Sequence, residues 1–432
     1  MKKLLVYSKE NDIIAEVYYD PINGIFEGTN VNIPEEIMLW KEAIDGEKDN
    51  YVNMRIFTGH ECNLRCAYCY QEGERNNSIT RKAIDVHKLC DGIVYAYRQR
   101  RKSEDAALML SFIGGEPLLH WERIKEVILD LERRVPKLYA HIITNGTLFT
   151  GSIARFCAKH DVGIVLSHDG LGQYLRGVDP LEAGRESAKA LMWLARQRSS
   201  EGNYLFSVSC TLTRNNLSAK EVRKWLRERI KGNEIIIGDA PACRAQKDGV
   251  LDLYSLKGEH LEDYFFGILE ALSTESPEYY RSYRSMLKSF LRLICDHEPY
   301  PDVGPCLARA KDAFAVDWSG NMLRCHGQNP ESIFRCGSIN KVGNLLEWYS
   351  KDLTLEETRA EMANGAVQST LDIPECRSCP MLPACHGACP MLDEAGWRNH
   401  CSARYTQALA VFTAVLKMIW PDMEEFSFEP CD

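Results

Sequence analysis

The cysteines of this chain constrain its fold more than any other feature. Seventeen occur among 432 residues, and many stand in two groups, one around Cys66 and one in the last third. The first residues (MKKLLVYSKEND) turn polar after four apolar positions, unlike the long apolar core of a signal peptide. We therefore expect a cytoplasmic protein, in which disulfides are rare and clustered thiols usually bind metal.

Composition excludes two classes of partner. The net charge of −9 argues against nucleic acid, which needs a basic surface. No run reaches the ~18 apolar residues of a membrane span, and the nearest, Ala408 to Trp420, contains Lys417. With 45 % hydrophobic residues the chain can build a core, so we predict two or three domains and neither membrane nor nucleic-acid binding.

Strand-like and helix-like patterns alternate between residues 51 and 240. The predicted strands are Asn53–Thr58, Ala107–Ile113, His141–Thr144, Gly163–Ser167, Phe206–Leu212 and Glu234–Ile237. The predicted helices between them are Thr80–Arg101, Trp121–Arg134, Pro180–Arg198 and Ser218–Ile230. Such alternation predicts parallel strands with crossover helices, and six units favour an α/β fold built on a partial (β/α)6 TIM-like barrel. Barrels of this kind carry their chemistry at the carboxyl ends of the strands.

The remaining segments suggest three further parts. Residues 1–50 contain two short β patterns and a brief helix, which we interpret as an N-terminal β/α cap. Residues 241–300 contain two helical patterns and form a helical bridge. Residues 301–432 show weak periodicity apart from a hairpin near Ala313–Leu323 and a C-terminal helix, but carry many cysteines. We expect metal to hold this last domain together.

Three cysteines follow the first predicted barrel strand. Cys62, Cys66 and Cys69 are spaced so that their thiolates can converge from one loop on a four-iron cluster, leaving the fourth iron open. A tetrahedral zinc ion would need a fourth protein ligand, for which His60 is the nearest candidate. The spacing leaves both alternatives open.

Glycine and polar residues recur at the ends of the next three strands. These motifs are Gly114-Gly-Glu-Pro117, Thr144-Asn-Gly146 and Ser167-His-Asp-Gly170. Paired glycines let the backbone approach a ligand closely, and carbonyl groups there, with Glu116, can accept hydrogen bonds from an ammonium group. We therefore predict a ligand site at this edge of the barrel.

The C-terminal cysteines form the strongest signal in the chain. Cys376, Cys379, Cys385 and Cys389 have spacings that arise by chance with odds of roughly 1 in 1,000. Cys401 follows them, and Cys306 and Cys325 precede them. Prolines and a glycine within the run suit a loop that wraps around a cluster. A pair of structural zinc ions is the alternative.

The first cysteine motif, followed by Gly-Gly-Glu-Pro, resembles the radical S-adenosylmethionine (radical SAM) superfamily over residues 51–240. The resemblance implies that Cys62, Cys66 and Cys69 hold a [4Fe–4S] cluster whose remaining iron binds S-adenosylmethionine. It also implies cofactor-binding roles. Tyr68 would lie against the adenine, Gly114, Gly115 and Glu116 would meet the methionine ammonium, and Asn145 would lie near the cofactor. Ser167 and Arg176 would meet its carboxylate or ribose.

The same resemblance implies an oxidoreductase. Reductive cleavage of S-adenosylmethionine would yield a 5′-deoxyadenosyl radical that abstracts a hydrogen atom from the substrate. The cluster would need a low reduction potential, with a reduced ferredoxin or flavodoxin as electron donor. The barrel would orient the reactants and exclude water.

The C-terminal cysteines resemble the SPASM extension of peptide- and protein-modifying radical SAM enzymes, which carries two auxiliary clusters. The resemblance implies one cluster on Cys376, Cys379, Cys385 and Cys401, and another on Cys306, Cys325 and Cys389. The fourth ligand of the latter is open: Cys295 is the first choice, Cys336 and Cys243 follow, and an iron open to substrate is a further alternative. Three [4Fe–4S] clusters would thus be present.

Auxiliary clusters imply that the substrate loses two electrons and two protons. We predict a maturase that forms a thioether or carbon–carbon crosslink in a ribosomally made peptide. An anaerobic sulfatase-maturing enzyme, which makes formylglycine in a protein, is the second candidate. A metal-binding scaffold or redox sensor without catalysis is the alternative from another class. The sequence identifies no general base, because Asp169, Asp239 and Asp317 fit capping or turn roles, and it assigns no leader-binding element.

Overall fold

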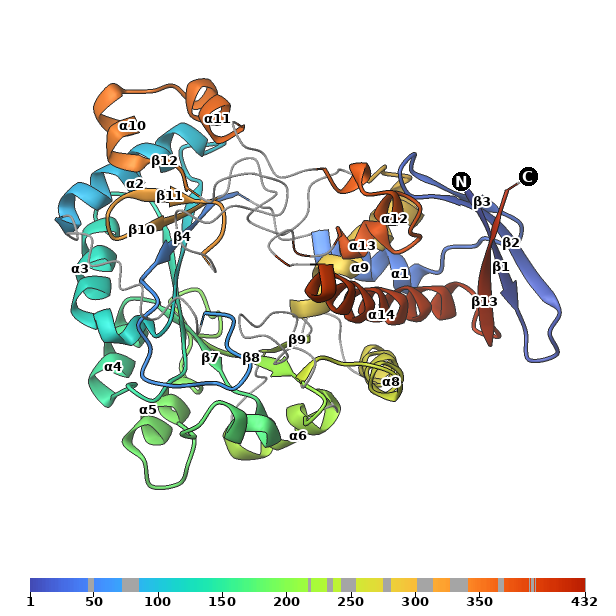
Figure 1. Cartoon of the computed structure of the whole chain (residues 1–432), viewed down its shortest axis with the longest axis horizontal. Helices are drawn as coiled ribbons and strands as arrows, with labels where there is room; N and C mark the ends of the chain where they lie inside the picture. Colours follow the sequence, from blue (N-terminus) through green and yellow to red (C-terminus); the bar gives the residue numbers. More distant parts are fainter. Residues whose placement is uncertain are drawn as a thin grey trace.

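A computed structural model shows how the chain folds (Figure 1). It describes residues 1–45, 50–71, 85–216, 219–230, 236–241, 254–274, 281–300, 314–326, 341–363, 369–387, 389, 392 and 394–431. A large sheet covered by helices occupies one side of the molecule, and a long helix with a small sheet occupies the other.

The large sheet contains six adjacent parallel strands. In order these are β4 (Tyr51–Phe57), β5 (Ala107–Ile113), β6 (Leu138–Thr144), β7 (Gly163–Ser167), β8 (Phe206–Leu212) and β9 (Ile236–Pro241). Each overlaps a strand predicted from the sequence, the sixth only at Ile236 and Ile237. Strands β4 to β8 bury alternate positions, such as Val208, Cys210 and Leu212 of β8, which explains why the sequence pattern located them. Among the described residues the two edge strands of this sheet do not pair with each other, and the predicted partial barrel is confirmed.

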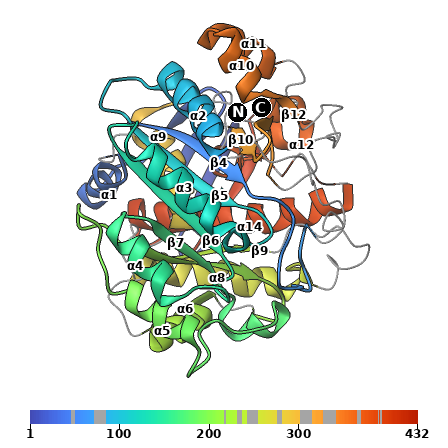
Figure 2. The ribbon, with the colours of Figure 1, turned by 90° about the vertical axis from the view of Figure 1, so that its left-hand side faces the viewer.

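Helices cover the outer face of these strands (Figure 2). They are α2 (Val86–Arg100), α3 (Trp121–Leu131), α4 (Gly151–Lys159), α5 (Glu186–Leu194) and α6 (Ala219–Ile230). In α3 the buried positions Ile124, Val127, Ile128 and Leu131 recur at helical spacing. The short α4, capped by Thr150, was not predicted.

The C-terminal region extends the same sheet. Strand β10 (Phe314–Asp317) pairs in parallel with β4, and β11 (Asn321–Leu323) and β12 (Lys341–Asn344) follow in antiparallel order. The predicted hairpin is therefore present, and it adds to the barrel at the strand that precedes the first cysteines.

A second sheet joins the two ends of the described chain. Its order is β13-β1-β2-β3, from β1 (Lys2–Tyr7), β2 (Ile13–Asp20), β3 (Ile25–Gly28) and β13 (Glu425–Pro430). Its inner face packs on α14 (Glu394–Ile419), with the rings of Tyr19 and Phe428 5.3 Å apart and those of Tyr19 and Phe412 5.7 Å apart. Aromatic burial therefore fixes the small sheet to the long helix.

Further helices surround α14. They are α1 (Glu35–Asp45), α8 (Glu259–Thr274), α9 (Arg281–Asp296), α12 (Pro374–Arg377) and α13 (Leu382–Cys385); α10 (Leu345–Lys351) and α11 (Leu355–Ala363) lie beside α2 and β12. Across the described ranges, no helix combines the length and apolar character needed to cross a bilayer. Three cysteines outside the two groups, Cys90, Cys157 and Cys210, are ordinary buried side chains, at most 1 % exposed.

Candidate metal and cofactor centre

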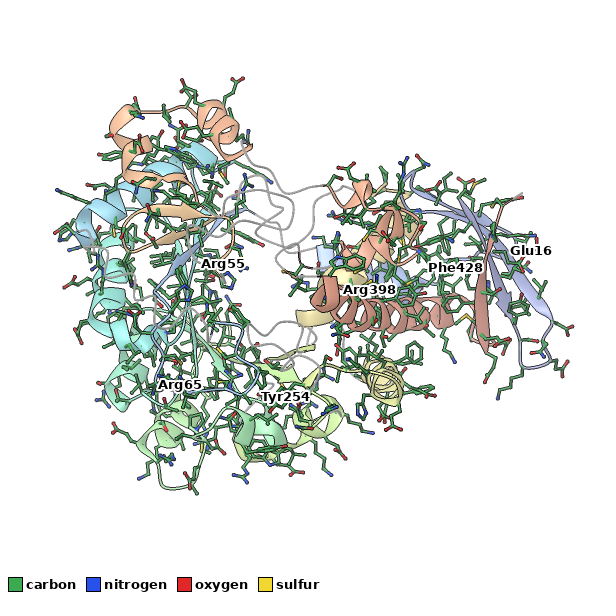
Figure 3. The ribbon with its side chains drawn as sticks, in the orientation of Figure 1. Glu16, Arg55, Arg65, Tyr254, Arg398 and Phe428 are labelled. Carbon is green, nitrogen blue, oxygen red and sulfur yellow. The ribbon has the colours of Figure 1, made fainter. Side chains whose placement is uncertain are left out.

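The three-cysteine loop begins where β4 ends and is held by backbone hydrogen bonds. The Cys69 N–H donates to the Cys66 carbonyl (3.1 Å), and the Ala67 N–H donates to the carbonyl of Leu175 (2.8 Å). Within the loop, Arg65, labelled in Figure 3, donates to the Cys62 carbonyl at 2.8 Å. The loop is thus shaped internally and tied to the segment that follows β7.

The Cys62 sulfur receives two donors. The Leu64 N–H lies 3.4 Å from it, and the Asn145 side-chain amide lies 3.9 Å from it. Donors aimed at a sulfur favour the thiolate, which is the form that binds metal.

The Cys66 thiol is affected mainly by burial. Burial raises the pKa of this thiol to about 11, the Arg176 guanidinium opposes that rise, and the nearby Cys69 and Cys62 thiols add to it. The Cys66 thiol therefore lies near both of the other thiols of the loop. Positive iron would remove the penalty on thiolate formation.

These cysteines fit an iron–sulfur cluster. In the parts of the chain that the structure describes, no three His, Cys, Asp or Glu side chains lie close enough together to ligate one metal ion. Thiolates around a four-iron cluster bind different irons, so they surround the cluster instead of meeting at one point. His60, the alternative zinc ligand, is 3 % exposed and packs against the Phe57 ring with centroids 4.8 Å apart.

The paired glycines lie directly against the chain that leads to Cys62. The Gly115 N–H donates to the Gly59 carbonyl (2.8 Å), and the Glu116 N–H donates to the Glu61 carbonyl (2.8 Å). A Cβ atom on Gly115 would lie 2.2 Å from the Glu61 carbonyl oxygen, which no real side chain tolerates. Glycine is therefore required here by the approach of two backbones.

Glu116 is fully buried at the carboxyl edge of the sheet. Its Oε1 accepts the Leu118 N–H (3.0 Å) and the Thr144 hydroxyl (2.6 Å), and its Oε2 accepts the Asn145 N–H (2.8 Å). Burial raises the pKa of this carboxyl, although these hydrogen bonds act in the opposite direction. Glu116 thus links the ends of β5 and β6, and its contact with a methionine ammonium stays a prediction.

Asn145 and Ser167 also lie at this edge. The Asn145 side-chain amide donates to the Asn63 side-chain oxygen (2.9 Å), next to the cysteine loop. Ser167 ends β7, where it pairs with Ser209 of β8 and is half-buried. Both residues therefore occupy the carboxyl end of the barrel, as their strand positions predicted.

Tyr68, Asp169 and Arg176 form a buried charged group. The Tyr68 hydroxyl donates to the Asp169 carboxylate, and Arg176 Nη1 donates to the Tyr68 oxygen (2.9 Å) and lies 3.4 Å from Asp169 Oδ1. Burial alone would lower the pKa of Arg176, but interactions with Tyr68, Asp169 and Cys66 raise it, so the guanidinium stays charged. Tyr254, labelled in Figure 3, packs on the Tyr68 ring with centroids 6.3 Å apart.

Sequence reasoning missed the part that Asp169 plays. It assigned this residue a turn or capping role, whereas the carboxylate is fully buried and also accepts the Thr211 N–H (2.8 Å). The sequence does contain a hint of this role, since Asp169 lies in the Ser-His-Asp-Gly strand end and Arg176 follows seven residues later. Spacing alone could not show that Asp169 and Arg176 pair.

The second cysteine group surrounds one cavity. Its lining residues are Glu375, Cys376, Cys379, Leu382, Cys385, Gly387, Trp397, Cys401 and Tyr405. The four cysteines among them come from α12, the turn after it, α13 and α14. Cys389 is not among the lining residues. The cavity thus brings together the four thiols that the sequence assigned to one auxiliary cluster.

The turns around this cavity suit a cluster. Gly387 has φ +76° and His386 has φ +54°, so the chain reverses immediately after Cys385. Burial raises the pKa of Cys401 to about 11, and the neighbouring Cys385 and Cys379 thiols contribute. Burial also raises the pKa of Cys379, while the Met381 and Leu382 amides oppose the rise. A bound cation would stabilise the thiolates against this burial.

Only some of the ligands predicted for the other auxiliary cluster lie among the described residues. Cys325 follows β11, and its neighbour His326 lies 3.5 Å from Arg55 of β4 and accepts a hydrogen bond from Gln71 (3.3 Å). Cys295 lies on α9, where burial raises the pKa of its thiol to about 11 beside Asp296 and Lys41. Three other predicted or alternative ligands, Cys306, Cys336 and Cys243, lie outside the described residues.

Asp317 and Asp239 are the two other aspartates that the sequence analysis considered as general bases. Asp317 has a turn role, because its Oδ1 accepts the Ser319 N–H (2.8 Å) and the Asn321 N–H (3.0 Å). Asp239 lies in β9, and its side chain is not among those described.

Comparison with known proteins assigns part of the barrel to a family. Residues 56–194 match the Radical SAM superfamily profile. Over 204 residues the chain is 26 % identical to the radical SAM cyclopropyl synthase TigE of Paramaledivibacter caminithermalis, covering 39 % of this chain and 41 % of TigE. Over 114 residues it is 31 % identical to a cysteine-type anaerobic sulfatase-maturating enzyme of Clostridium perfringens, covering 25 % of this chain and 30 % of that enzyme. These matches span less than half of each relative.

The fold likeness extends further than the sequence likeness. The solved structure of anSMEcpe with bound AdoMet matches with a TM-score of 0.60 over 85 % of this chain and 99 % of that one, at 18 % identity. At that identity the match concerns fold alone. The sequence resemblance is confirmed: residues 56–194 form a radical SAM domain.

Proposed function

We propose that this protein is a radical SAM enzyme that oxidatively modifies a side chain of a peptide or protein. The observation that carries the proposal is the position of the loop with Cys62, Cys66 and Cys69 just after β4, where the segment that leads into this loop, residues 58–61, lies directly against the backbone of Gly114 and Gly115. These three thiols would hold a [4Fe–4S] cluster. With S-adenosylmethionine bound, such a cluster supplies radical chemistry that no protein side chain provides.

The chain's own residues would bind and orient the cofactor. Tyr68, Gly114, Gly115, Glu116, Asn145, Ser167 and Arg176 are the proposed S-adenosylmethionine-binding residues. Support comes from their common position at one edge of the barrel and from the burial of Glu116 and Asn145, at 0 % and 6 % exposed. A buried polar edge of this kind holds a charged ligand in place and limits access of water.

Two auxiliary clusters would accept electrons from the substrate. Cys376, Cys379, Cys385 and Cys401 would hold one, which is supported by the cavity they line. Cys306, Cys325 and Cys389 would hold the other, with Cys295, Cys336, Cys243 or an open iron completing it. A reduced ferredoxin or flavodoxin in the cytoplasm is the proposed electron donor.

A crosslinked ribosomal peptide is the product we propose. Support comes from the match to TigE, a cyclopropyl synthase. Formylglycine formation in a sulfatase is the second candidate, favoured by the 31 % identity over 114 residues to a cysteine-type anaerobic sulfatase-maturating enzyme. A crosslink removes two hydrogens from one peptide, whereas formylglycine formation from cysteine removes sulfur.

The test is anaerobic reconstitution of the full chain with iron and sulfide, followed by dithionite and S-adenosylmethionine. We expect 5′-deoxyadenosine, and about twelve irons per chain from three four-iron clusters. Cys66→Ala should abolish the product, and Cys157→Ala, which changes a fully buried cysteine of α4, should retain it. Undiminished product from Cys66→Ala would refute the site, and no product from the wild type would favour the scaffold alternative.

A second experiment separates the two substrates. Short peptides encoded beside the gene, and a sulfatase-derived peptide containing cysteine, are incubated separately with the reconstituted enzyme. Mass spectrometry then identifies the change. Loss of two hydrogens from an encoded peptide supports the crosslinking maturase, and formylglycine in the sulfatase peptide reverses the ranking.

A further inference from the structure

Arg176 places a fixed positive charge beside the first cysteine loop. Its side chain is 12 % exposed, and its Nη1 donates to the Tyr68 hydroxyl oxygen at 2.9 Å. The backbone is fixed as well, because the Leu175 carbonyl accepts the Ala67 N–H at 2.8 Å. The guanidinium therefore cannot move without disturbing the loop.

Asp169 supplies the matching negative charge. Its side chain is 1 % exposed, and its Oδ1 accepts the Thr211 N–H at 2.8 Å and lies 3.4 Å from Arg176 Nη1. The Asp169 carboxylate also accepts the Tyr68 hydroxyl, so both charges contact Tyr68, which lies between Cys66 and Cys69 in the loop.

Such charges affect an iron–sulfur cluster in a known direction. Reduction adds one negative charge to the cluster, so a nearby positive charge favours the reduced form and a nearby negative charge disfavours it. Net charge and hydrogen bonding are among the factors that set cluster potentials. Burial strengthens the effect, because surrounding protein screens charge less than water does.

We infer that Arg176 raises, and Asp169 lowers, the reduction potential of the cluster on Cys62, Cys66 and Cys69. Both residues would act on the cluster through their charge, and their hydrogen bonds with Tyr68 connect them to the loop. The inference rests on the proposed function, because it requires a cluster on these cysteines. It concerns the cluster before any S-adenosylmethionine binds, so it is separate from the contact of Arg176 with that cofactor.

The test is a redox titration of the reconstituted full chain, followed by electron paramagnetic resonance without S-adenosylmethionine. The signal of the first cluster is the one that Cys66→Ala removes. Arg176→Gln should shift its midpoint potential downwards and Asp169→Asn should shift it upwards. Arg176→Lys should stay near the wild type because it keeps the charge. The matched control is Arg133→Gln in the turn after α3; the Arg133 side chain is 72 % exposed, so this variant should give no shift.

Opposite shifts separate this role from a merely structural one. If both variants shift the potential in the same direction, or neither does, the inference is wrong. If Arg176→Gln binds no iron, the test rests on Arg176→Lys and Asp169→Asn. A midpoint potential that rises in Asp169→Asn and stays unchanged in Arg176→Lys supports the inference. No rise in Asp169→Asn overturns it. A wild-type chain without any Cys66-dependent signal would refute the proposed function as well.

Discussion

Glu116 offers the sharpest test of how the barrel edge is built. Its two carboxylate oxygens accept the N–H groups of Leu118 (3.0 Å) and Asn145 (2.8 Å) and the hydroxyl of Thr144 (2.6 Å). In Glu116→Gln one oxygen becomes an NH2 group, which cannot accept. Whichever way the new amide turns, one buried backbone N–H loses its acceptor, while the Thr144 hydroxyl can rotate.

The cost follows from the group left without a partner. A buried donor without an acceptor costs about 1–3 kcal/mol. Burial raises the pKa of Glu116, so removing the charge also relieves a desolvation penalty and places the net cost towards the lower end of that range. A net cost of about 1–2 kcal/mol should then make local opening around Asn145 roughly 5- to 30-fold more frequent, since each 1.4 kcal/mol is about tenfold.

Hydrogen–deuterium exchange of the intact protein measures this opening directly. Peptides covering 114–120 and 138–147 should exchange faster in Glu116→Gln, with remote helices unchanged. The control is Glu122→Gln on α3, whose side chain is 77 % exposed. Unchanged exchange in both peptides, or an equal change in the control, would refute the assigned role of this carboxylate.

Three further predictions concern other parts of the molecule. Trp318→Phe should cost about 1 kcal/mol in urea unfolding, because the indole N–H donates to the Thr58 carbonyl at 3.0 Å; no loss would contradict this contact. Cys385→Ala should lower the iron content by about four per chain, and Cys157→Ala should leave it unchanged; equal losses would argue against a cluster in the cavity. Burial alone would raise the pKa of Asp179, but its hydrogen bond with a buried histidine lowers it. The stability it adds is therefore present above about pH 4 and lost as pH falls through the lowered pKa, so Asp179→Asn should destabilise at pH 7 and much less at about pH 3.

The local pattern was sufficient for the barrel strands. Ala107–Ile113, Gly163–Ser167 and Phe206–Leu212 have the bounds predicted from the sequence. These strands bury alternate residues, such as Leu108, Leu110 and Phe112 of β5, and this alternation is visible in any short window. Helix α4 escaped because its pattern is only nine residues long, and the β13–β1 pairing escaped because it joins opposite ends of the described chain.

The second cysteine group shows how far the spacing of cysteines in the sequence can predict which of them share a cluster. The resemblance assigned Cys376, Cys379, Cys385 and Cys401 to one cluster and Cys389 to another, and the cavity is lined by the first four. Closely spaced thiols constrain one another because a short chain limits their separation. Cys325 lies far from its proposed partners in sequence, so only the fold can bring them together.

The sequence by itself therefore determined the elements whose cause is local: apolar strands, glycine-rich strand ends and closely spaced thiols. Only the tertiary structure decided which distant groups meet. The addition of β10 to β4, the three hydrogen bonds to Glu116, and the joining of Tyr68, Asp169 and Arg176 all depend on it. The physical reason is that buried charges and hydrogen-bonding groups must find partners wherever the fold places them, and chain spacing carries no record of that choice.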